Sequence, residues 1–542
     1  MTMNTGSSKF NHIISRCDRV SDRPPVRYRV MAKTDMSGPL KKVTFGKKHP
    51  EKRNKTILLV GETGAGKSTL INALLNYTMG VKWEDEVWFE IVEDEKRGQS
   101  ESQTSDVIVY EIFGFEGKTL PYSLTIIDTP GYGSTKGTEH DVIINQRLFD
   151  LFRSQDGVHE IDAVGLAVKA TECRVSDRLL YIFSSIMSLF GNDIAKHIVL
   201  LITYSNGRRP ENVFQALKAA NIECAQNENN EPVHFLFDNY QHEVRNQPGY
   251  PDVPDTTSAC GIAKLTDFLK NTVPQKLEKT VEVIKEHIRL TACIQNLQDR
   301  IELIELKRRE IKEIQQAVKK HEQEMKLNAE FEIEVNEPYK HKESISTGMW
   351  GLFFYEAAVC CPLCEETCHY PGCTVAWKPA HCEVMKGGRC TVCSRKCLAS
   401  AHVKEKWRYV NKIKKVKKTL TGVKEKYDKN KAASLKASAI LDDLQKEIDN
   451  LEADKEKWID MVVQHVETLS EIALKVDSVS TYVHLDYLTK KMKENGDTEK
   501  FQKLKEKICQ VNEAVRSGVK YAYDGMCKIF AKNKENKEGT NV

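Results

Sequence analysis

The chain of 542 residues lacks three features that would each assign it to a class of protein. It has no run of about 18 consecutive apolar residues, so no membrane-spanning helix is expected. It has no large excess of one charge, because 81 lysines and arginines stand against 77 aspartates and glutamates. This balance excludes a uniformly basic nucleic-acid coat and an acidic tail protein, and we expect no specific nucleic-acid partner. It also has no internal repeat of about 20–50 residues.

Neither end of the sequence carries a targeting signal. The N-terminal stretch MTMNTGSSKFNHII lacks the basic-then-apolar pattern of a signal peptide and does not begin with Met-Gly, and the C-terminal Thr-Asn-Val is not a prenylation box. We therefore expect a cytoplasmic protein. Thiols stay reduced in that compartment, so the 16 cysteines indicate metal binding rather than disulfides.

The first half of the chain shows the pattern of an α/β fold. Residues 1–54 are basic and poor in periodic apolar residues, which predicts a mostly disordered segment or, alternatively, a basic arm for acidic partners or a membrane surface. Over residues 55–275, short β-branched runs alternate with helical stretches, which predicts a mainly parallel sheet covered on both faces. The predicted strands are Thr56–Val60, Val107–Ile112, Ser123–Ile127, Ala163–Val168, Ile198–Thr203 and Val233–Phe237.

The second half is predicted to be helical around a small cysteine-rich module. A first heptad seam, in residues 276–347, consists of Leu290, Ile294, Leu297, Ile301, Ile304, Ile311 and Val318, with Arg308 and Gln315 interrupting it. A second seam, in residues 404–475, consists of Leu441, Leu444, Ile448, Leu451, Trp458 and Val462. We expect two coiled-coil helices there, a zinc module at residues 348–403 and a helical tail with a polar end at residues 476–542. The Lys-rich residues 404–431 indicate a solvated helix face or, as the alternative, a site for an acidic partner.

A phosphate-binding loop is the most specific pattern in the sequence. The residues after the apolar run ILLV fit Gly-x4-Gly-Lys-Ser and precede an amphipathic helix; they are Gly61, Glu62, Thr63, Gly64, Ala65, Gly66, Lys67, Ser68 and Thr69. Glycines in such a loop let backbone N–H groups converge on phosphate oxygens, next to a helix N-terminus. We expect Lys67 to reach the β- and γ-phosphates and Ser68 to bind Mg²⁺.

The next strand favours GTP. SLTIIDTPGYG places Asp128 at a strand end with Gly131 three residues later, the spacing at which a GTPase binds Mg²⁺ and senses the γ-phosphate. Upstream, SESQTSDV lies where a switch threonine that ligates Mg²⁺ belongs; Thr104 is the first choice and Ser105 the second. Lys67 and Thr104 are thus the candidate catalytic residues.

GETGAGKSTLINALL followed by DTPGYG resembles the immunity-associated GTPases, the GIMAP family, and their septin-like relatives. The resemblance covers residues 55–275. It implies binding of GTP and GDP with Mg²⁺, slow hydrolysis and self-association through this GTP-binding (G) domain, to which the predicted coiled coil and an unidentified protein partner would add.

The sequence departs from that family at two positions. After the strand Ile198–Ile202 the base-reading loop begins at Thr203 and carries Asn206 where an aspartate would accept two hydrogen bonds from guanine, so guanine preference is expected to be weaker. Asp238 or Asn239 could supply other contacts, and Asn239 joins the candidate binding residues. After Gly131 stands Tyr132 instead of a water-positioning glutamine, which predicts slow turnover or catalysis completed by a second protomer.

The cysteine-rich segment has the spacing of a zinc module. Nine cysteines fall between Cys360 and Cys397, including two C-x2-C pairs. The candidate ligands are Cys361, Cys364, Cys368, His369, Cys373, Cys382, Cys390, Cys393, Cys397 and His402. They exceed what two zinc ions need, and adjacent Cys368 and His369 rarely bind the same ion. Cross-braced pairing, Cys361/Cys364 with Cys390/Cys393, and sequential pairing both remain open. Glu365, Glu366 and Glu383 lie nearby, but nothing marks an open catalytic position, so the zinc is interpreted as structural.

Three alternatives stand beside a GTP-dependent assembly switch. A scaffold could hold nucleotide without turnover, since the acidic base reader and the catalytic glutamine are both missing. A zinc-module ubiquitin ligase is a further candidate. An SMC-like ATPase is disfavoured, because no second nucleotide-binding half follows the predicted coiled coil and Asp128 is not followed by a glutamate.

Overall fold

The computed structural model of the chain describes residues 9–36, 41–92, 106–132, 138–171, 177–241, 256–320, 332–345, 349–350, 354–355, 357–370, 373, 376, 378–419 and 437–474. These residues fall into two compact units, one of residues 9–284 with 472–474 and one of residues 285–471. No helix within the described ranges is long and apolar enough to cross a membrane. The predicted tail, residues 476–542, lies outside the described residues.

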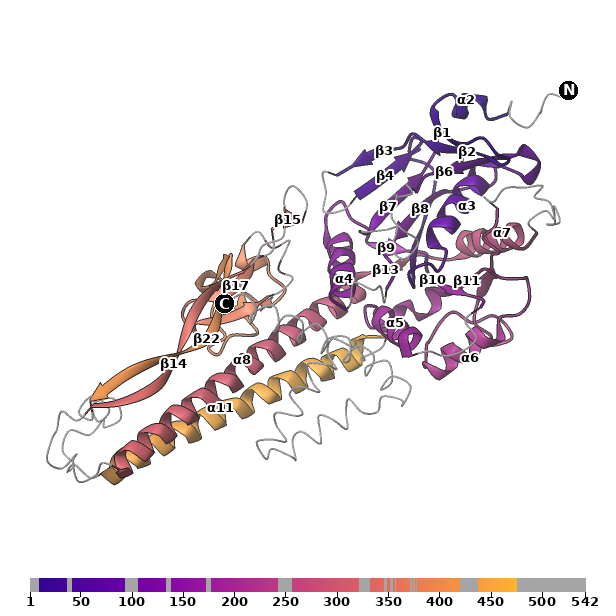
Figure 1. Cartoon of the computed structure of the whole chain (residues 1–542). Helices are drawn as coiled ribbons and strands as arrows, with labels where there is room; N and C mark the ends of the chain where they lie inside the picture. The colour runs from indigo at the N-terminus through magenta and orange to yellow at the C-terminus, as the bar shows by residue number, and fades with distance from the viewer. Residues whose placement is uncertain are drawn as a thin grey trace. The chain divides into compact units, whose positions relative to one another are not determined.

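An eight-stranded sheet forms the centre of the first unit (Figure 1). Its strands, from one edge to the other, are β12 (His234–Leu236), β11 (Ile198–Thr203), β10 (Ala163–Lys169), β5 (Asn54–Gly61), β8 (Ser123–Asp128), β7 (Ile108–Ile112), β4 (Lys41–Phe45) and β3 (Lys33–Asp35). The five strands from β12 to β8 are parallel, whereas β7 is antiparallel to β8 and β3 to β4. The predicted mainly parallel sheet is confirmed.

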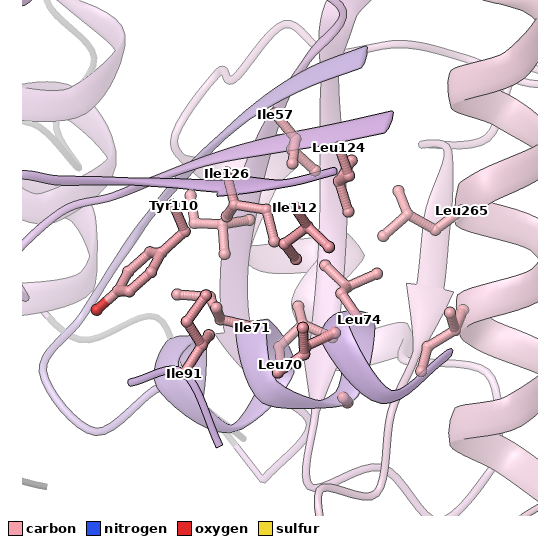
Figure 2. Close-up of a cluster of buried hydrophobic side chains, with 14 of the residues drawn as sticks. Ile57, Leu70, Ile71, Leu74, Ile91, Tyr110, Ile112, Leu124, Ile126 and Leu265 are labelled. Carbon is pink, nitrogen blue, oxygen red and sulfur yellow. The ribbon is translucent and has the colours of Figure 1, made fainter. Parts of the chain in front are cut away.

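Helices cover both faces of this sheet because its central strands are apolar on both sides. Along β5, the residues from Ile57 to Val60 have no exposed surface. Ile57 packs with Leu70 and Leu74 of helix α3 (Lys67–Met79) on one face, as Figure 2 shows. Each such side chain contributes about 1.5–3 kcal/mol through burial. The other helices of the unit are α4 (Thr138–Arg153), α5 (Asp177–Met187), α6 (Glu211–Ala219) and α7 (Thr256–Asn271).

The expectation of a mostly disordered segment over residues 1–54 is wrong for the described residues. β3 and β4 extend the main sheet, and a smaller sheet contains β1 (Cys17–Ser21), β2 (Val26–Val30) and β6 (Val87–Glu90), next to the short helix α2 (Asn11–Ile14). In these short strands few residues face the core, as the single buried Val43 of β4 shows. Lysines and arginines take several of the remaining positions and conceal the strand pattern. The short strands β9 (Glu160–Ile161) and β13 (Gln275–Lys276) pair with each other.

Two long helices run side by side in the second unit (Figure 1). Helix α8 (Glu278–Lys320) and helix α11 (Ala437–Ile472) are antiparallel, since Glu286 of α8 contacts His465 of α11 while Lys307 contacts Glu447. The predicted apolar positions Leu290, Ile294, Leu297, Ile301, Ile304 and Ile311 are buried. Arg308, which interrupts the seam, forms an ion pair with Glu452.

A long hairpin takes the place of two predicted helical segments. β14 (Glu332–Ser344) pairs antiparallel with β22 (Trp407–Thr419) over thirteen residues, so the first helix ends well before residue 347 and the second begins only at Ala437. Lysines dominate β22, and glutamates of β14 pair with them, for example Glu337 with Lys414 at 3.2 Å. For residues 404–419 the Lys-rich stretch is therefore a strand, and its acidic partner lies in the same chain.

The cysteine-rich module consists of short strands and loops between the two strands of this hairpin. Its strands are β15 (Met349–Trp350), β16 (Phe354–Tyr355), β17 (Ala358–Cys361), β18 (Glu366–His369), β19 (Met385–Lys386), β20 (Arg389–Cys390) and β21 (Val403–Glu405). β17 lies between β18 and β21, whereas β19 and β20 form a separate ribbon. Secondary structure this short cannot build a large apolar core.

Candidate functional site: a phosphate-binding loop and a cysteine–histidine module

The phosphate-binding loop lies at the carboxyl end of β5, between its two parallel neighbours β10 and β8. The chain continues from β5 to β8 on one side of this strand and later to β10 on its other side. In open α/β sheets, ligands bind at the carboxyl ends of the strands where the strand order reverses in this way. Gly64 and Gly66 have φ of +77° and +81°, in the left-handed region that glycine adopts without steric strain. The residues Gly61–Thr69 thus form the backbone turn that the sequence pattern predicts.

Two side chains from neighbouring strands hold this loop. Thr203, at the end of β11, donates a hydrogen bond from Oγ1 to the carbonyl oxygen of Ala65 at 2.8 Å. Asn239, which follows β12, donates from Nδ2 to the carbonyl oxygen of Gly66 at 3.3 Å and is itself buried. A Cβ atom on Gly66 would lie 2.1 Å from Asn239 Nδ2, so only glycine fits there. The structure thus brings Thr203 and Asn239 to the loop, as predicted.

Lys67 lies inside the loop. Its Nζ donates to the carbonyl oxygens of Gly61 and Glu62, both at 3.2 Å, and the side chain is buried. Burial lowers the pKa of Lys67, while the charges of Asp128 and Glu62 act in the opposite direction. An ammonium group held this way is surrounded by acceptors that a phosphate could replace.

The segment from Asp128 to Tyr132 lies against the loop. Asp128 ends β8 and is fully buried. Thr63 Oγ1 donates to the carbonyl oxygen of Gly131 at 3.2 Å, and the Tyr132 N–H donates to the carbonyl oxygen of Gly61 at 3.1 Å. The Tyr132 ring is fully buried and its hydroxyl contacts Asn145 Oδ1 at 3.0 Å, so Tyr132 is a packing residue.

The candidate residues for contacting the base, Asn206, Asp238 and Asn239, lie in different surroundings. Asn206 is exposed on the loop after β11, where its Oδ1 accepts the N–H of Arg208 at 3.1 Å. Asp238 accepts a hydrogen bond from Ser258 of α7 at 2.7 Å and is therefore a turn residue, in contrast to Asn239. The rings of Tyr204 and Tyr240, on the two loops concerned, lie edge to face with their centroids 6.5 Å apart.

Thr104 and Ser105, the two candidates for the switch threonine, lie outside the described residues. Ser68 and Thr69 begin α3 and are partly buried. Sequence reasoning missed Lys169 at the end of β10, whose Nζ would lie 3.7 Å from a Cβ on Gly64. The available signal was its position directly after the predicted apolar strand Ala163–Val168.

These observations fit a nucleotide with Mg²⁺. The left-handed glycines keep the loop clear of Cβ atoms, Lys67 supplies a buried cation, and Ser68 and Asp128 supply oxygen ligands of the type that Mg²⁺ prefers. Residues Gly61–Thr69 could thus hold the phosphates, and Ser68 and Asp128 could hold the metal.

The cysteine–histidine module brings its predicted ligands together in three groups. The atoms that could ligate a metal lie within 4.8 Å of one another in each group. The first group is Cys361, Cys364, Cys393 and Cys397; the second is Cys368, Cys390, Cys393 and His402; the third is His369, Cys373, Cys382 and Glu383. All ten predicted ligands take part.

The grouping settles some of the alternatives that the sequence left open. Cys368 and His369 belong to different groups, as expected. Neither simple pairing describes the module, because Cys361 and Cys364 meet Cys393 and Cys397, whereas Cys390 meets Cys368. Sequence reasoning missed Glu383 as a ligand, although it directly follows Cys382, and it expected two ions where the described residues form three groups.

The sulfur geometry fits a tetrahedral metal. Cys364 and Cys397 Sγ lie 3.7 Å apart, and Cys373 and Cys382 Sγ lie 3.8 Å apart. Zinc–sulfur bonds of about 2.3 Å at tetrahedral angles place two sulfurs about 3.8 Å apart. A disulfide would need sulfurs about 2 Å apart.

Backbone and histidine contacts complete this fit. The N–H groups of Val392 and Cys393 donate to Cys390 Sγ, each at 3.3 Å. His402 Nδ1 donates to the carbonyl oxygen of Leu398 at 2.9 Å, which directs a buried Nε2 at Cys368, Cys390 and Cys393. No hydrogen bond of ordinary geometry satisfies that Nε2 among the described residues. A ligating histidine has this arrangement, with its other ring nitrogen held by a backbone carbonyl.

The charges in these groups favour a cation. Burial acts to lower the pKa of His402, but the nearby sulfurs of Cys390 and Cys393 outweigh burial and raise the pKa to about 10. In the third group, the hydrogen bond from Cys382 lowers the pKa of Cys373 to about 5. A pocket of sulfurs that stabilises a proton on imidazole also stabilises a metal ion.

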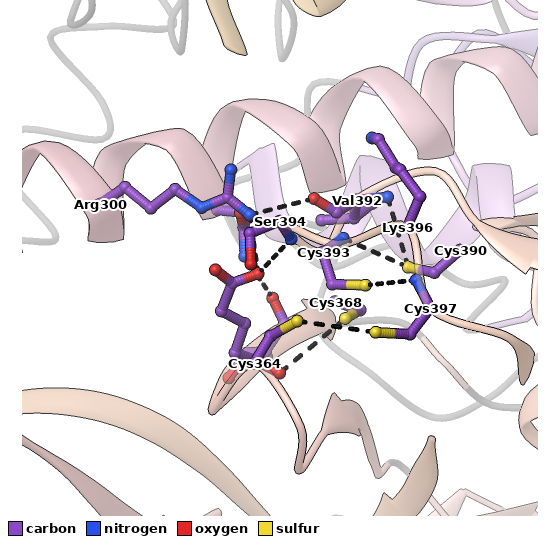
Figure 3. Close-up of polar contacts among 12 residues, drawn as sticks. Arg300, Cys364, Cys368, Cys390, Val392, Cys393, Ser394, Lys396 and Cys397 are labelled. Atoms are coloured by element: carbon purple, nitrogen blue, oxygen red, sulfur yellow. Dashed lines mark hydrogen bonds and ion pairs between the residues drawn. The ribbon is translucent and has the colours of Figure 1, made fainter. Parts of the chain in front are cut away.

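Helix α8 holds the module through charged and polar side chains (Figure 3). Arg300 donates to Glu366 Oε2 at 2.7 Å and to the carbonyl oxygen of Val392 at 3.2 Å. The Ser394 N–H donates to the same Glu366 oxygen at 2.8 Å. Glu366 is therefore a structural partner of α8 and is not a metal ligand.

Comparison with known proteins assigns only the first unit. Residues 55–239 match the AIG1 family, which confirms the resemblance predicted from the two phosphate motifs. No curated protein matches the chain. A chain from a structure of the chloroplast translocon components atToc33 and psToc159, for which dimerisation is important for GTPase activity, is 18% identical with a TM-score of 0.29; the match covers 41% of this chain and 85% of that one.

A structure of Toc33 from Arabidopsis thaliana in complex with GDP and Mg²⁺ is 16% identical, with a TM-score of 0.27 and coverage of 43% of this chain and 84% of that one. Similarity at this level carries no inference about activity.

The contact between Gly66 and Asn239 makes a specific prediction. Gly66→Ala would place a Cβ against Asn239 Nδ2 and deform the loop, so we expect nucleotide affinity to fall by about tenfold or more, the effect of about 1.4 kcal/mol. Titration with a fluorescent GTP analogue measures it. Gly117→Ala is the matched control, since Gly117 has a similar φ of +94° but no atom within 4 Å of its Cβ position. Equal affinities for the two variants would contradict the assignment.

Proposed function

We propose that the first unit binds GTP and GDP with Mg²⁺, hydrolyses GTP slowly and acts as a nucleotide-dependent assembly switch. The observation that carries the proposal is the phosphate-binding loop of an AIG1-family domain, held by Thr203 and Asn239 around a buried Lys67 and beside Asp128. Lys67 contacts the β- and γ-phosphates, whereas Ser68 and Asp128 hold the metal. Thr104 is the further metal ligand in this proposal.

Slow turnover is supported by the burial of Tyr132. A glutamine next to the γ-phosphate can orient the attacking water, but the ring that follows Gly131 here is buried and its hydroxyl contacts Asn145. Transition-state stabilisation then depends on Lys67 and Mg²⁺ or on a group from a second protomer. The alternative, a scaffold that holds nucleotide without turnover, is supported by the same residue.

Phosphate release separates slow hydrolysis from a scaffold. We expect purified protein to release phosphate from GTP at a low but measurable rate that falls about tenfold or more in Lys67→Ala, because a charge-assisted contact to the phosphates is lost. Lys264→Ala, at an exposed position of α7, serves as the control and should keep the rate of the unmodified chain. A rate equal to that of Lys67→Ala would support the scaffold and exclude the GTPase.

Base selection is proposed to depend on Asn206 and Asn239 together. Asn206 offers one accepting oxygen. Asn239 bonds the carbonyl oxygen of Gly66, in the part of the phosphate-binding loop nearest the base-reading positions. Because no aspartate accepts two hydrogen bonds from guanine, GTP should be preferred over ATP by a smaller factor than in a domain with the full motif.

Asn206→Asp tests this reading. The substitution should restore a charge-assisted contact worth about 1.5–3 kcal/mol and strengthen GTP binding about tenfold to a hundredfold. Displacement of a labelled GTP analogue by GTP, ATP and XTP measures the gain, which should be absent for ATP. Asn229→Asp adds the same charge at an exposed loop position and should change nothing. A preference of the unmodified chain for ATP would overturn the substrate assignment.

Assembly through the G domain is proposed from the family resemblance. The nucleotide state would change the two switch loops, Gln99–Val107 and Gly131–Asp141, and thereby bias association of protomers. The predicted coiled coil and an unidentified protein partner would add to this association. A cytoplasmic location is proposed as well, because cysteine clusters that could hold a metal suit a compartment in which thiols stay reduced.

Sedimentation velocity tests the assembly part of the proposal. We expect a larger species with a non-hydrolysable GTP analogue than with GDP, because the γ-phosphate changes the two switch loops. Lys67→Ala should remain at the size seen with GDP. A single monomeric species with the GTP analogue, with GDP and without nucleotide would rule out nucleotide-dependent assembly and leave GTP binding unaffected.

A further inference from the structure

The cysteine–histidine module contains two ligand groups that share one residue. Cys361, Cys364 and Cys397 surround one position, and Cys368, Cys390 and His402 surround another, while Cys393 belongs to both groups. We propose that the module binds three Zn²⁺ ions, that the Cys393 thiolate bridges two of them, and that the third is held by His369, Cys373, Cys382 and Glu383.

The number of ligands requires the bridge. Structural zinc takes four ligands in a tetrahedron. The first two groups together contain seven residues, so two ions reach four ligands each only if one sulfur binds both. A thiolate has lone pairs for two metal bonds, whereas the neutral His402 ring has one free nitrogen, because its Nδ1–H is bonded to Leu398.

The surroundings of Cys393 suit a bridging thiolate. Its side chain is fully buried, so no water competes for the second metal bond. The N–H of Cys397 donates to Cys393 Sγ at 3.3 Å, which orients the sulfur between the two groups. The bridged pair would carry six thiolates against two divalent ions, and the Lys396 ammonium interacts electrostatically with Cys390 and Cys393. A positive side chain at this place offsets part of the excess negative charge.

The third group is a separate closed site. His369 Nδ1 lies 3.1 Å from Cys382 Sγ and 3.7 Å from Glu383 Oε2, and Cys373 Sγ lies 3.8 Å from Cys382 Sγ. All four residues are buried. Two thiolates, an imidazole and a carboxylate form a complete tetrahedral set for zinc with no open position for a substrate. Arg289 Nε donates to the backbone carbonyl of Glu383 at 2.9 Å, which fixes this ligand to α8.

Native mass spectrometry and metal analysis of the full chain test the count. We expect three zinc ions per chain, and the same number in Cys260→Ser, which removes an exposed thiol of α7 outside the groups. Glu383→Ala should retain only the bridged pair. Cys361→Ser should lose one ion of that pair, because Cys361 belongs to the first group only. A count of two in the unmodified chain, an unchanged count in Glu383→Ala, or iron in place of zinc would overturn the proposal.

The bridge itself has two independent readouts. Cys393→Ser should lose both ions of the pair and retain one, whereas the loss of a single ion would show that Cys393 serves only one metal. Because this variant could fail to fold, the unmodified chain is also loaded with Co²⁺. Two Co²⁺ ions joined by a thiolate couple antiferromagnetically, so the low-temperature electron paramagnetic resonance signal should correspond to one uncoupled ion per chain. A signal from three independent ions would exclude the bridge.

Discussion

Parallel pairing of β5 with β8 on one side and with β10 on the other determines where the chemistry of the first unit can occur. Parallel strands end at the same edge of a sheet, so Gly61, Asp128 and Thr203 arrive together although the sequence separates them widely. The apolar residues of these strands make that edge rigid. The phosphate-binding loop, its buried lysine and its metal ligands are consequences of this single arrangement.

The sequence was most informative where local pattern and tertiary role coincide. The phosphate-binding loop needs glycines in a left-handed conformation, and the central strands need apolar residues on both faces, so both are visible as residue types. The N-terminal strands are not visible in this way, because a strand such as β4 buries only Val43 among its five residues and carries two lysines. Asn239 was identified by its position after a strand, but its hydrogen bond to Gly66 depends on the fold.

In the second unit, periodicity predicted the helices but not their limits. Lysines in β22 alternate with Tyr409, Ile413 and Val416 in a pattern that also suits a solvated helix, and the glutamates that decide for a strand lie more than 70 residues earlier in β14. For the metal ligands, residue type sufficed and all ten candidates were found. The sharing of Cys393 and the role of Glu383 are properties of three-dimensional position, which spacing alone does not determine.

Single side chains of helix α8 contact both the cysteine–histidine module and helix α11. Arg300 bonds Glu366 of the module while its guanidinium lies 3.4 Å from the ring centroid of Trp458 in α11. About two turns away, Cys293 contacts both the Thr391 carbonyl oxygen and His465. Neither neighbour can therefore slide or rotate along α8 alone, because each shared contact would break on both sides at once. Helix α8, helix α11 and the module are therefore coupled. A disturbance that loosens the module also affects the register of the two long helices.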